Sequence, residues 1–278
     1  MRKLLVFPIA TLLLFSSACA TEDPGGDEGE DSGRAQGALN STESSSAETA
    51  LLATTIGPAE DAAATATSGA ELAAAVLDAV TSGVTVLCEI TGSVSATADA
   101  DSVTFVFDNC SNHCGLLAAT GTVVVTYDIL SATGVSASLS TDSFRVNGVT
   151  VDLAVDVEYS WTSSAETMAI TTDASITGPL GGVSTRQGSY SASFDEAALC
   201  ITQQGEWSTR IGLLGGTTRL DSYRRCALSC PDVGSRFSFE ARSGWSISLE
   251  YTDVDEVSWV NSRGAEGTIT FPRLCGGS

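Results

Sequence analysis

The sequence is short of positive charge. Its 278 residues include one lysine, Lys3, and 13 Lys and Arg in total against 34 Asp and Glu, so that the formal net charge is −21. Nucleic-acid binding depends on clustered lysine and arginine side chains that neutralise phosphates. We therefore expect no nucleic-acid partner. The deficit is uneven: residues 84–199 carry thirteen acids against Arg145 and Arg186, whereas residues 200–278 carry nine acids against eight arginines.

The sequence also lacks the residue combinations of common active sites. His113 is the single histidine, and there is no GxSxG, HExxH or P-loop motif. Carboxylate chemistry needs two acids facing one cleft. Asp152, Asp156 and Glu158 instead alternate with apolar residues, which is typical of the solvated face of a strand. The acids of "TDVDE" (252–256) lack the glycine and the distant glutamate of a calcium loop. We expect no enzyme activity, no cofactor and no metal site.

No hydrophobic run is long enough to span a bilayer as a helix. The longest at the N-terminus, residues 4–15, follows Arg2 and Lys3, and this arrangement is typical of a secretory signal. Ser17 and Ala18 stand directly before Cys19, and this segment resembles a bacterial lipoprotein signal, although Ser16 stands where that family usually has leucine. The resemblance implies that residues 1–18 are removed and that Cys19 is acylated, which gives the protein a membrane partner. Because Ala20 follows Cys19, it also implies the outer membrane. The alternative is cleavage after Ala20, which would leave a soluble secreted protein.

Aromatic residues are absent between Ala20 and Thr67. This tract is rich in Ala, Gly, Ser and Thr, and eight acids lie between Glu22 and Glu48 against Arg34. Segments with few apolar groups and high net charge seldom order themselves. We therefore predict that residues 19–67 form a disordered acidic tether that is dispensable for folding, and that residues 68–278 form a single β-rich domain.

The start of this domain has the signals of one helix, over about residues 69–82. Ser68 and Glu71 match a capping box, Leu72, Val76 and Val80 are spaced four apart, and Gly83 is placed to end the helix. After Gly83 the apolar period changes to two, most clearly over residues 149–161, and turn signals separate the apolar runs. Among these signals, the pair Asn147-Gly148 is favoured in two-residue hairpins.

These patterns predict an all-β fold with one N-terminal helix. We expect roughly a dozen strands in a large antiparallel meander, because short turns join most of the runs. A sheet of this size seldom stays flat, so we expect it to curl, either into a half-barrel with the helix in its concave side or into a flattened barrel. Trp161, Trp207, Trp245 and Trp259 lie in register with the apolar faces of their strands, which favours core packing over ligand contact.

Seven cysteines remain after Cys19, and in an exported protein they indicate disulfides. Their odd number leaves at least one thiol free or paired between chains. The spacings in "CSNHC" and "CALSC" suit structural zinc less well than disulfides. A hairpin turn near Asp99 would place Cys88 opposite Cys110, and the competing bond is Cys110–Cys114. The candidates are Cys88, Cys110, Cys114, Cys200, Cys226, Cys230 and Cys275.

The sequence therefore favours a non-catalytic envelope lipoprotein that displays a disulfide-bonded β-domain for binding or for a structural role. The alternative is a carrier that shelters a lipid or another hydrophobic ligand against the concave face of the sheet. A carrier predicts an apolar cavity, whereas the first hypothesis predicts a dense core.

Overall fold

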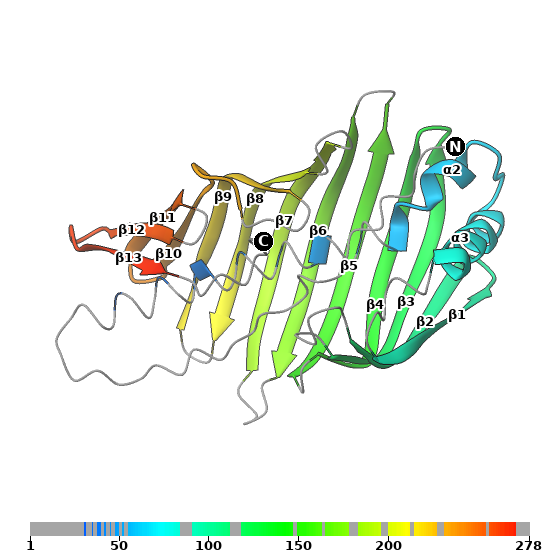
Figure 1. Ribbon diagram of the computed structural model, residues 1–278, viewed down its shortest axis with the longest axis horizontal. Helices are drawn as coiled ribbons and strands as arrows, with labels where there is room; N and C mark the ends of the chain where they lie inside the picture. Colours follow the sequence, from blue (N-terminus) through cyan, green and yellow to red (C-terminus); the bar gives the residue numbers. More distant parts are fainter. Residues whose placement is uncertain are drawn as a thin grey trace.

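The protein is built on one open sheet of thirteen antiparallel strands. The computed structural model describes residues 31, 35, 38–39, 42, 45, 48–49, 52, 55–83, 91–111, 118–146, 149–162, 165–177, 183–195, 200–211, 214–226, 231–253 and 256–270. Each strand pairs with its neighbours in sequence, so the sheet is a pure meander that is not closed into a barrel (Figure 1). The predicted fold class is confirmed: the protein is mostly β, and its large antiparallel sheet is curled.

The strands are longest in the middle of the sheet and shortest at the C-terminal edge. Their bounds are β1 Thr91–Asp99, β2 Ser102–Ser111, β3 Ala118–Ser131, β4 Gly134–Val146, β5 Val149–Trp161, β6 Glu166–Thr177, β7 Val183–Asp195, β8 Cys200–Ile211, β9 Leu214–Cys226, β10 Arg236–Ala241, β11 Ser246–Asp253, β12 Glu256–Asn261 and β13 Glu266–Thr270. Val146 pairs with Val149, as the predicted two-residue hairpin requires, and residues 147 and 148 lie outside the described residues.

The period of two gives the sheet one dry face and one wet face. Along β5 the buried side chains include Val151, Val155 and Tyr159, and these alternate with exposed Asp152, Asp156 and Glu158. The predicted alternation is thus correct for this strand. Because the sheet does not close on itself, its apolar face, called here the inner face, must be covered by other parts of the chain.

The predicted helix forms as α3 (Gly69–Gly83) and covers one edge of the inner face. It contacts β1, β2 and β3, while the short α2 (Ala59–Ala63) contacts β4 (Figure 1). The Glu71 amide donates to Ser68 Oγ at 3.3 Å, as a capping box requires. The reciprocal contact is shifted by one residue, because Glu71 Oε2 accepts from the Thr67 amide at 2.6 Å. The hydrogen bonds that the Thr67 amide and hydroxyl donate to the Glu71 carboxylate lower the pKa of Glu71.

The middle of the inner face is covered by residues that we expected in a disordered tether. Eleven described positions between 31 and 56 are helical, are spaced mostly three or four apart, and are 0% to 7% exposed. Such spacing places them on one face of a helix. We call this set the helical row: Asp31, Ala35, Ala38, Leu39, Thr42, Ser45, Glu48, Thr49, Leu52, Thr55 and Ile56.

For the helical row, the expectation of a tether over residues 19–67 is wrong. Alanine, serine and threonine bury little apolar area by themselves, so the composition resembles that of a disordered segment. They nevertheless allow a helix to lie close to a sheet that supplies the large side chains. In Figure 1 the short blue segments of this row cross in front of the central strands.

Removal of the helical row should therefore destabilise the domain. We predict that a chain starting at Ser68 loses more than about 5 kcal/mol of unfolding free energy relative to one starting at Asp31, because burial of Leu39, Leu52 and Ile56 contributes about 1.5–3 kcal/mol each. Urea denaturation of both chains, followed by circular dichroism, measures the difference. Equal urea midpoints would contradict the packing described above.

Candidate functional site

The inner face of the sheet is held to the helical row by three groups of hydrogen bonds. Near the C-terminal edge, Asn261 Nδ2 of β12 donates to the Asp31 carboxylate at 2.6 Å. At the other end of the row, the Tyr127 hydroxyl of β3 donates to the Thr55 carbonyl at 2.7 Å. Between them lies a buried polar cluster on β6, β7 and β8. The row therefore crosses most of the width of the sheet.

The central cluster is built around a buried ion pair. Arg186 Nη2 lies 3.0 Å from Glu48 Oε2, and both side chains are 6% exposed. The Thr172 hydroxyl donates to the same carboxylate oxygen at 3.0 Å, and the Tyr190 hydroxyl donates to Glu48 Oε1 at 2.9 Å. Two strands, β6 and β7, and the helical row thus meet at one carboxylate.

The surroundings of this ion pair are aromatic and amide groups. The Arg186 guanidinium carbon lies 4.9 Å from the centre of the Trp207 ring and 5.7 Å from that of Tyr190, within the range of cation–π attraction. Gln203 Nε2 donates to Thr49 Oγ1 at 2.6 Å and to the Ser45 carbonyl at 3.2 Å. Every charged group in the cluster therefore contacts a partner of suitable chemistry.

Tyrosines at these contacts are held in the protonated form. Burial, followed by the charge of Glu48, raises the pKa of Tyr190 well above its ordinary value. Burial also raises the pKa of Tyr127. Tyr159, whose hydroxyl lies between Glu166 and Glu60, has its pKa raised by burial and then by these two carboxylates. The three hydroxyls serve as hydrogen-bond donors that position the row and α2.

Sequence reasoning missed this cluster. Arg186 precedes Tyr190 by four residues, which is two repeats of the strand period, so it lies on the same predicted inner face as Tyr190. This alternation was a signal that could have identified Arg186 as buried. The helical spacing of Ala35, Leu39, Leu52 and Ile56 was a second signal, but the acids around these residues obscured it.

The outer face of the sheet is polar and carries a broad groove. The groove has a volume of about 970 Å³ and crosses β4 to β9. Its floor is formed by small side chains such as Ser136, Ala169 and Ser191, and charged groups stand along it: Asp156, Glu158, Glu206, Arg219 and Asp221. Arg219 Nη2 is paired with Glu206 at 3.0 Å, and Ser138 Oγ donates to Asp156 at 2.7 Å. The predicted position of Asp152, Asp156 and Glu158 on the solvated face is confirmed.

The tryptophans lie on the inner face. Trp207, Trp245 and Trp259 are 1% to 6% exposed, and Trp161 is half-buried against Tyr159. The prediction that these residues pack in the core is confirmed for the three buried side chains.

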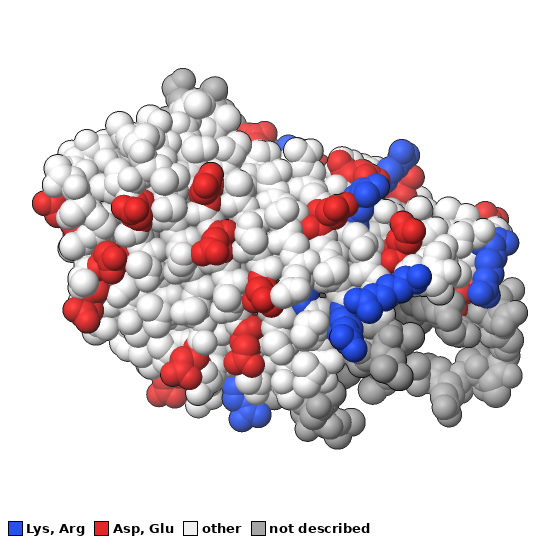
Figure 2. All heavy atoms as spheres, turned by 180° about the vertical axis from the view of Figure 1, so that it is seen from behind, with Lys and Arg blue, Asp and Glu red and all other residues white. Residues whose placement is uncertain are grey.

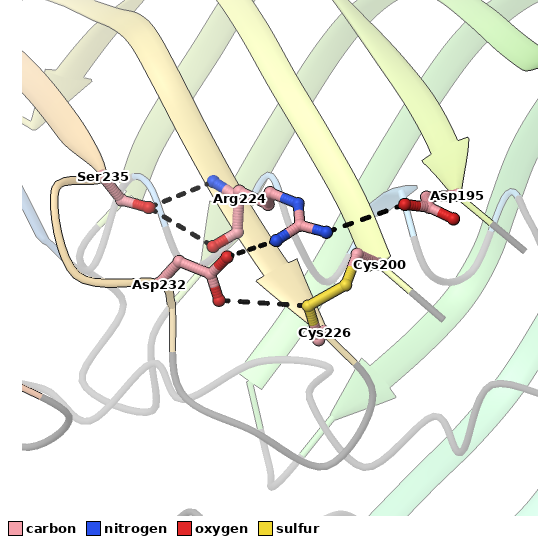
Figure 3. The surroundings of a disulfide bond; sticks show 6 residues. All are labelled: Asp195, Cys200, Arg224, Cys226, Asp232 and Ser235. Carbon is pink, nitrogen blue, oxygen red and sulfur yellow. Dashed lines mark hydrogen bonds and ion pairs between the residues drawn. A yellow bond between two sulfur atoms is a disulfide. The ribbon is translucent and has the colours of Figure 1, made fainter. Parts of the chain in front are cut away.

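One disulfide closes the end of the β8–β9 hairpin (Figure 3). Cys200 and Cys226 are directly paired across the two strands and are bonded. Beside them, Arg224 Nη1 contacts Asp232 at 2.6 Å and Nη2 lies 3.7 Å from Asp195. The Arg224 amide donates to Ser235 Oγ at 3.1 Å, and the Ser235 hydroxyl donates to the Arg224 carbonyl at 3.3 Å. The expectation of a disulfide is thus met at Cys200 and Cys226.

Cys110 is also disulfide-bonded, and its partner lies outside the described residues. Cys88, Cys114, Cys230, Cys275 and the acylation candidate Cys19 lie outside them as well. The turn that we placed near Asp99 is displaced, because Asp99 pairs with Ser102 and Val94 with Phe107. The register argument for Cys88 opposite Cys110 is therefore wrong for the described strands, and Cys110 stands beside Ala119 of β3 on its other side.

Comparison of the chain with protein families, with curated proteins and with solved structures finds no match. Within the described residues, no three His, Cys, Asp or Glu side chains are grouped to hold a metal ion. In the same part of the chain, no helix is long and apolar enough to cross a membrane.

The buried ion pair allows a sharp test of the inner face. We predict that Glu48→Gln lowers the unfolding free energy by about 3–5 kcal/mol, because it leaves the Arg186 charge buried without a counter-charge. The matched control Glu206→Gln removes an exposed pair and should cost less than about 1 kcal/mol. Adding Arg186→Met to Glu48→Gln should restore part of the loss. Equal effects of the two glutamine variants in urea denaturation would refute the assignment.

The β8–β9 disulfide should stabilise the protein mainly by restricting the conformations of the unfolded chain. It closes a loop with a sequence separation of 26 residues. We predict that replacing Cys200 and Cys226 with serine costs about 3–4 kcal/mol in the chain-entropy model. Thermal and urea unfolding of the oxidised proteins measure the loss. A difference below about 1 kcal/mol would show that the directly paired strands already hold these ends together.

Proposed function

We propose that this protein is a bacterial cell-envelope lipoprotein, acylated at Cys19, that presents the outer face of its sheet for binding and has no catalytic activity. The resemblance of residues 1–19 to a lipoprotein signal supports the anchor, and Ala20 after Cys19 supports the outer membrane. The observation that carries the choice among functions is the occupied inner face. A carrier needs that face for its ligand, and the helical row and α3 lie there instead.

The outer face is the surface that remains for recognition. Its groove combines hydroxyl groups, carboxylates and Arg219, a mixture that suits a polar partner better than a hydrophobic one. The absence of a nucleophile–histidine pair in the sequence, which has one histidine, supports a binding role over hydrolysis.

The anchor is testable in cells. We predict that Cys19→Ser moves the protein from the membrane fraction to the soluble envelope fraction, because several acyl chains hold a protein stably at a bilayer and their loss removes the attachment. Mass spectrometry of the mature N-terminal peptide provides the direct measurement. Ser17→Thr, which keeps a small residue before the cysteine, serves as the control. A mature chain that starts at Thr21 without lipid would disprove the proposal.

A further inference from the structure

The two ends of the strands differ in charge. One end consists of the turns that follow β2, β4, β6, β8, β10 and β12, together with the two strand residues on either side of each turn. In Figure 1 the arrowheads of β6 and β8 point to this end. Among its described residues, four arginines stand against two acids; we call it the arginine end: Arg145, Arg210, Arg242 and Arg263, with Glu240 and Glu266.

The opposite end has the reverse balance. The turns after β1, β3, β5, β7, β9 and β11, defined in the same way, carry seven described acids against two described arginines; we call this the acidic end: Asp99, Asp101, Glu166, Asp195, Asp232, Asp253 and Glu256, with Arg225 and Arg236. Arg236 is paired with Glu250 at 3.0 Å. In a chain with a net charge of −21, the arginine end is a local exception.

The arginines of the C-terminal part of this end are exposed and accessible. Arg242 and Arg263 are exposed and form no ion pair within the described part of the chain. Arg242 lies over Gly215: a Cβ atom added to this glycine would be 3.4 Å from Arg242 Nε. Arg210 and Arg242 border a hollow of about 630 Å³, which is also lined by Ser208, Thr217 and one acid, Glu240. Figure 2 shows most basic side chains on the half of the outer face away from β1.

The N-terminal segment joins the domain at this same end. Asp31 is bonded to Asn261, the last residue of β12. Cys19 and Asp31 are twelve positions apart in the sequence, and a fully extended chain of that length reaches about 40 Å. The acidic end is farther from this point by the length of β12, whose 6 residues span roughly 20 Å.

We infer that the arginine end faces the bilayer and contacts the phosphate groups of anionic phospholipids. This inference rests on the proposed acylation of Cys19. Attachment through Cys19 brings the arginine end near the membrane surface. The difference in charge between the two ends then orients the domain, because an anionic membrane attracts Arg242 and Arg263 and repels the seven acids of the acidic end. The attraction acts within a Debye length, about 8 Å at physiological salt.

Hydrogen exchange of the lipidated full chain on vesicles tests this orientation. We expect amides of residues 242–245 and 262–265 to exchange more slowly on phosphatidylcholine vesicles with 30% phosphatidylglycerol than on phosphatidylcholine alone. Amides of residues 232–235 should not change. Each arginine near the surface shifts the ratio of docked to undocked molecules by about fivefold. Arg242→Gln with Arg263→Gln should therefore lower that ratio about 25-fold and abolish the difference, as should 0.5 M NaCl.

The matched control is Arg219→Gln with Arg236→Gln, which removes two arginines away from the arginine end and should keep the protection. Equal exchange at both ends on anionic vesicles, or equal effects of the two double variants, would overturn the inference. Mass spectrometry of the N-terminal peptide reads acylation separately. A chain with a hexahistidine tag replacing Cys19, held on a nickel-chelating lipid, tests the surface even if acylation is disproved.

Discussion

The whole structure depends on covering the apolar face of an open sheet. Strand alternation gives thirteen strands one apolar side, and a meander that does not close has no second sheet to pack against. The cover comes from α3 at one edge and from the helical row across the middle. Leu52 and Ile56, at 0% exposed, supply apolar contacts, while Ala35 and Ser45 allow a close approach to the aromatic side chains of the strands. The row is therefore part of the core, although its composition is that of a linker.

Polar contacts fix where the helical row lies. Apolar packing of small side chains alone would tolerate sliding along the sheet, because alanine and threonine surfaces differ little from turn to turn. The Glu48 carboxylate has one position in which it meets Arg186, Tyr190 and Thr172 together. Asp31 with Asn261 and Thr55 with Tyr127 fix the two ends in the same way. A buried ion pair contributes little net stability compared with an apolar substitute, so its role here is placement.

The parts that could be predicted are those with a strong local pattern. The period of two along β5 and the capping signals of α3 depend on neighbouring residues, and both appear in the structure. The helical spacing of the row was obscured by the surrounding acids, and its partners on the sheet are distant: Glu48 is 138 positions from Arg186 in the sequence, and no local rule joins them. The Cys200–Cys226 bond required the register of β8 against β9. A shift of a few residues at the β1–β2 turn was enough to remove the register on which the pairing of Cys88 with Cys110 was argued.

The same alternation that creates the core also limits what the protein can recognise. In β5, Val155 and Tyr159 point to the inner face and Asp156 and Glu158 to the outer face. The alternation that makes the inner face apolar therefore makes the outer face hydrophilic. Because the helical row covers the inner face, the outer face and the turns remain for partners. A partner that binds to these surfaces would replace bound water by hydrogen bonds and ion pairs, and salt screens the ion pairs. The proposed binding role would therefore depend on the pattern of charge on the outer face and turns. That pattern is organised along two directions: from acid-rich β1–β6 to the arginine-bearing C-terminal strands, and from the acidic end of the strands to the arginine end.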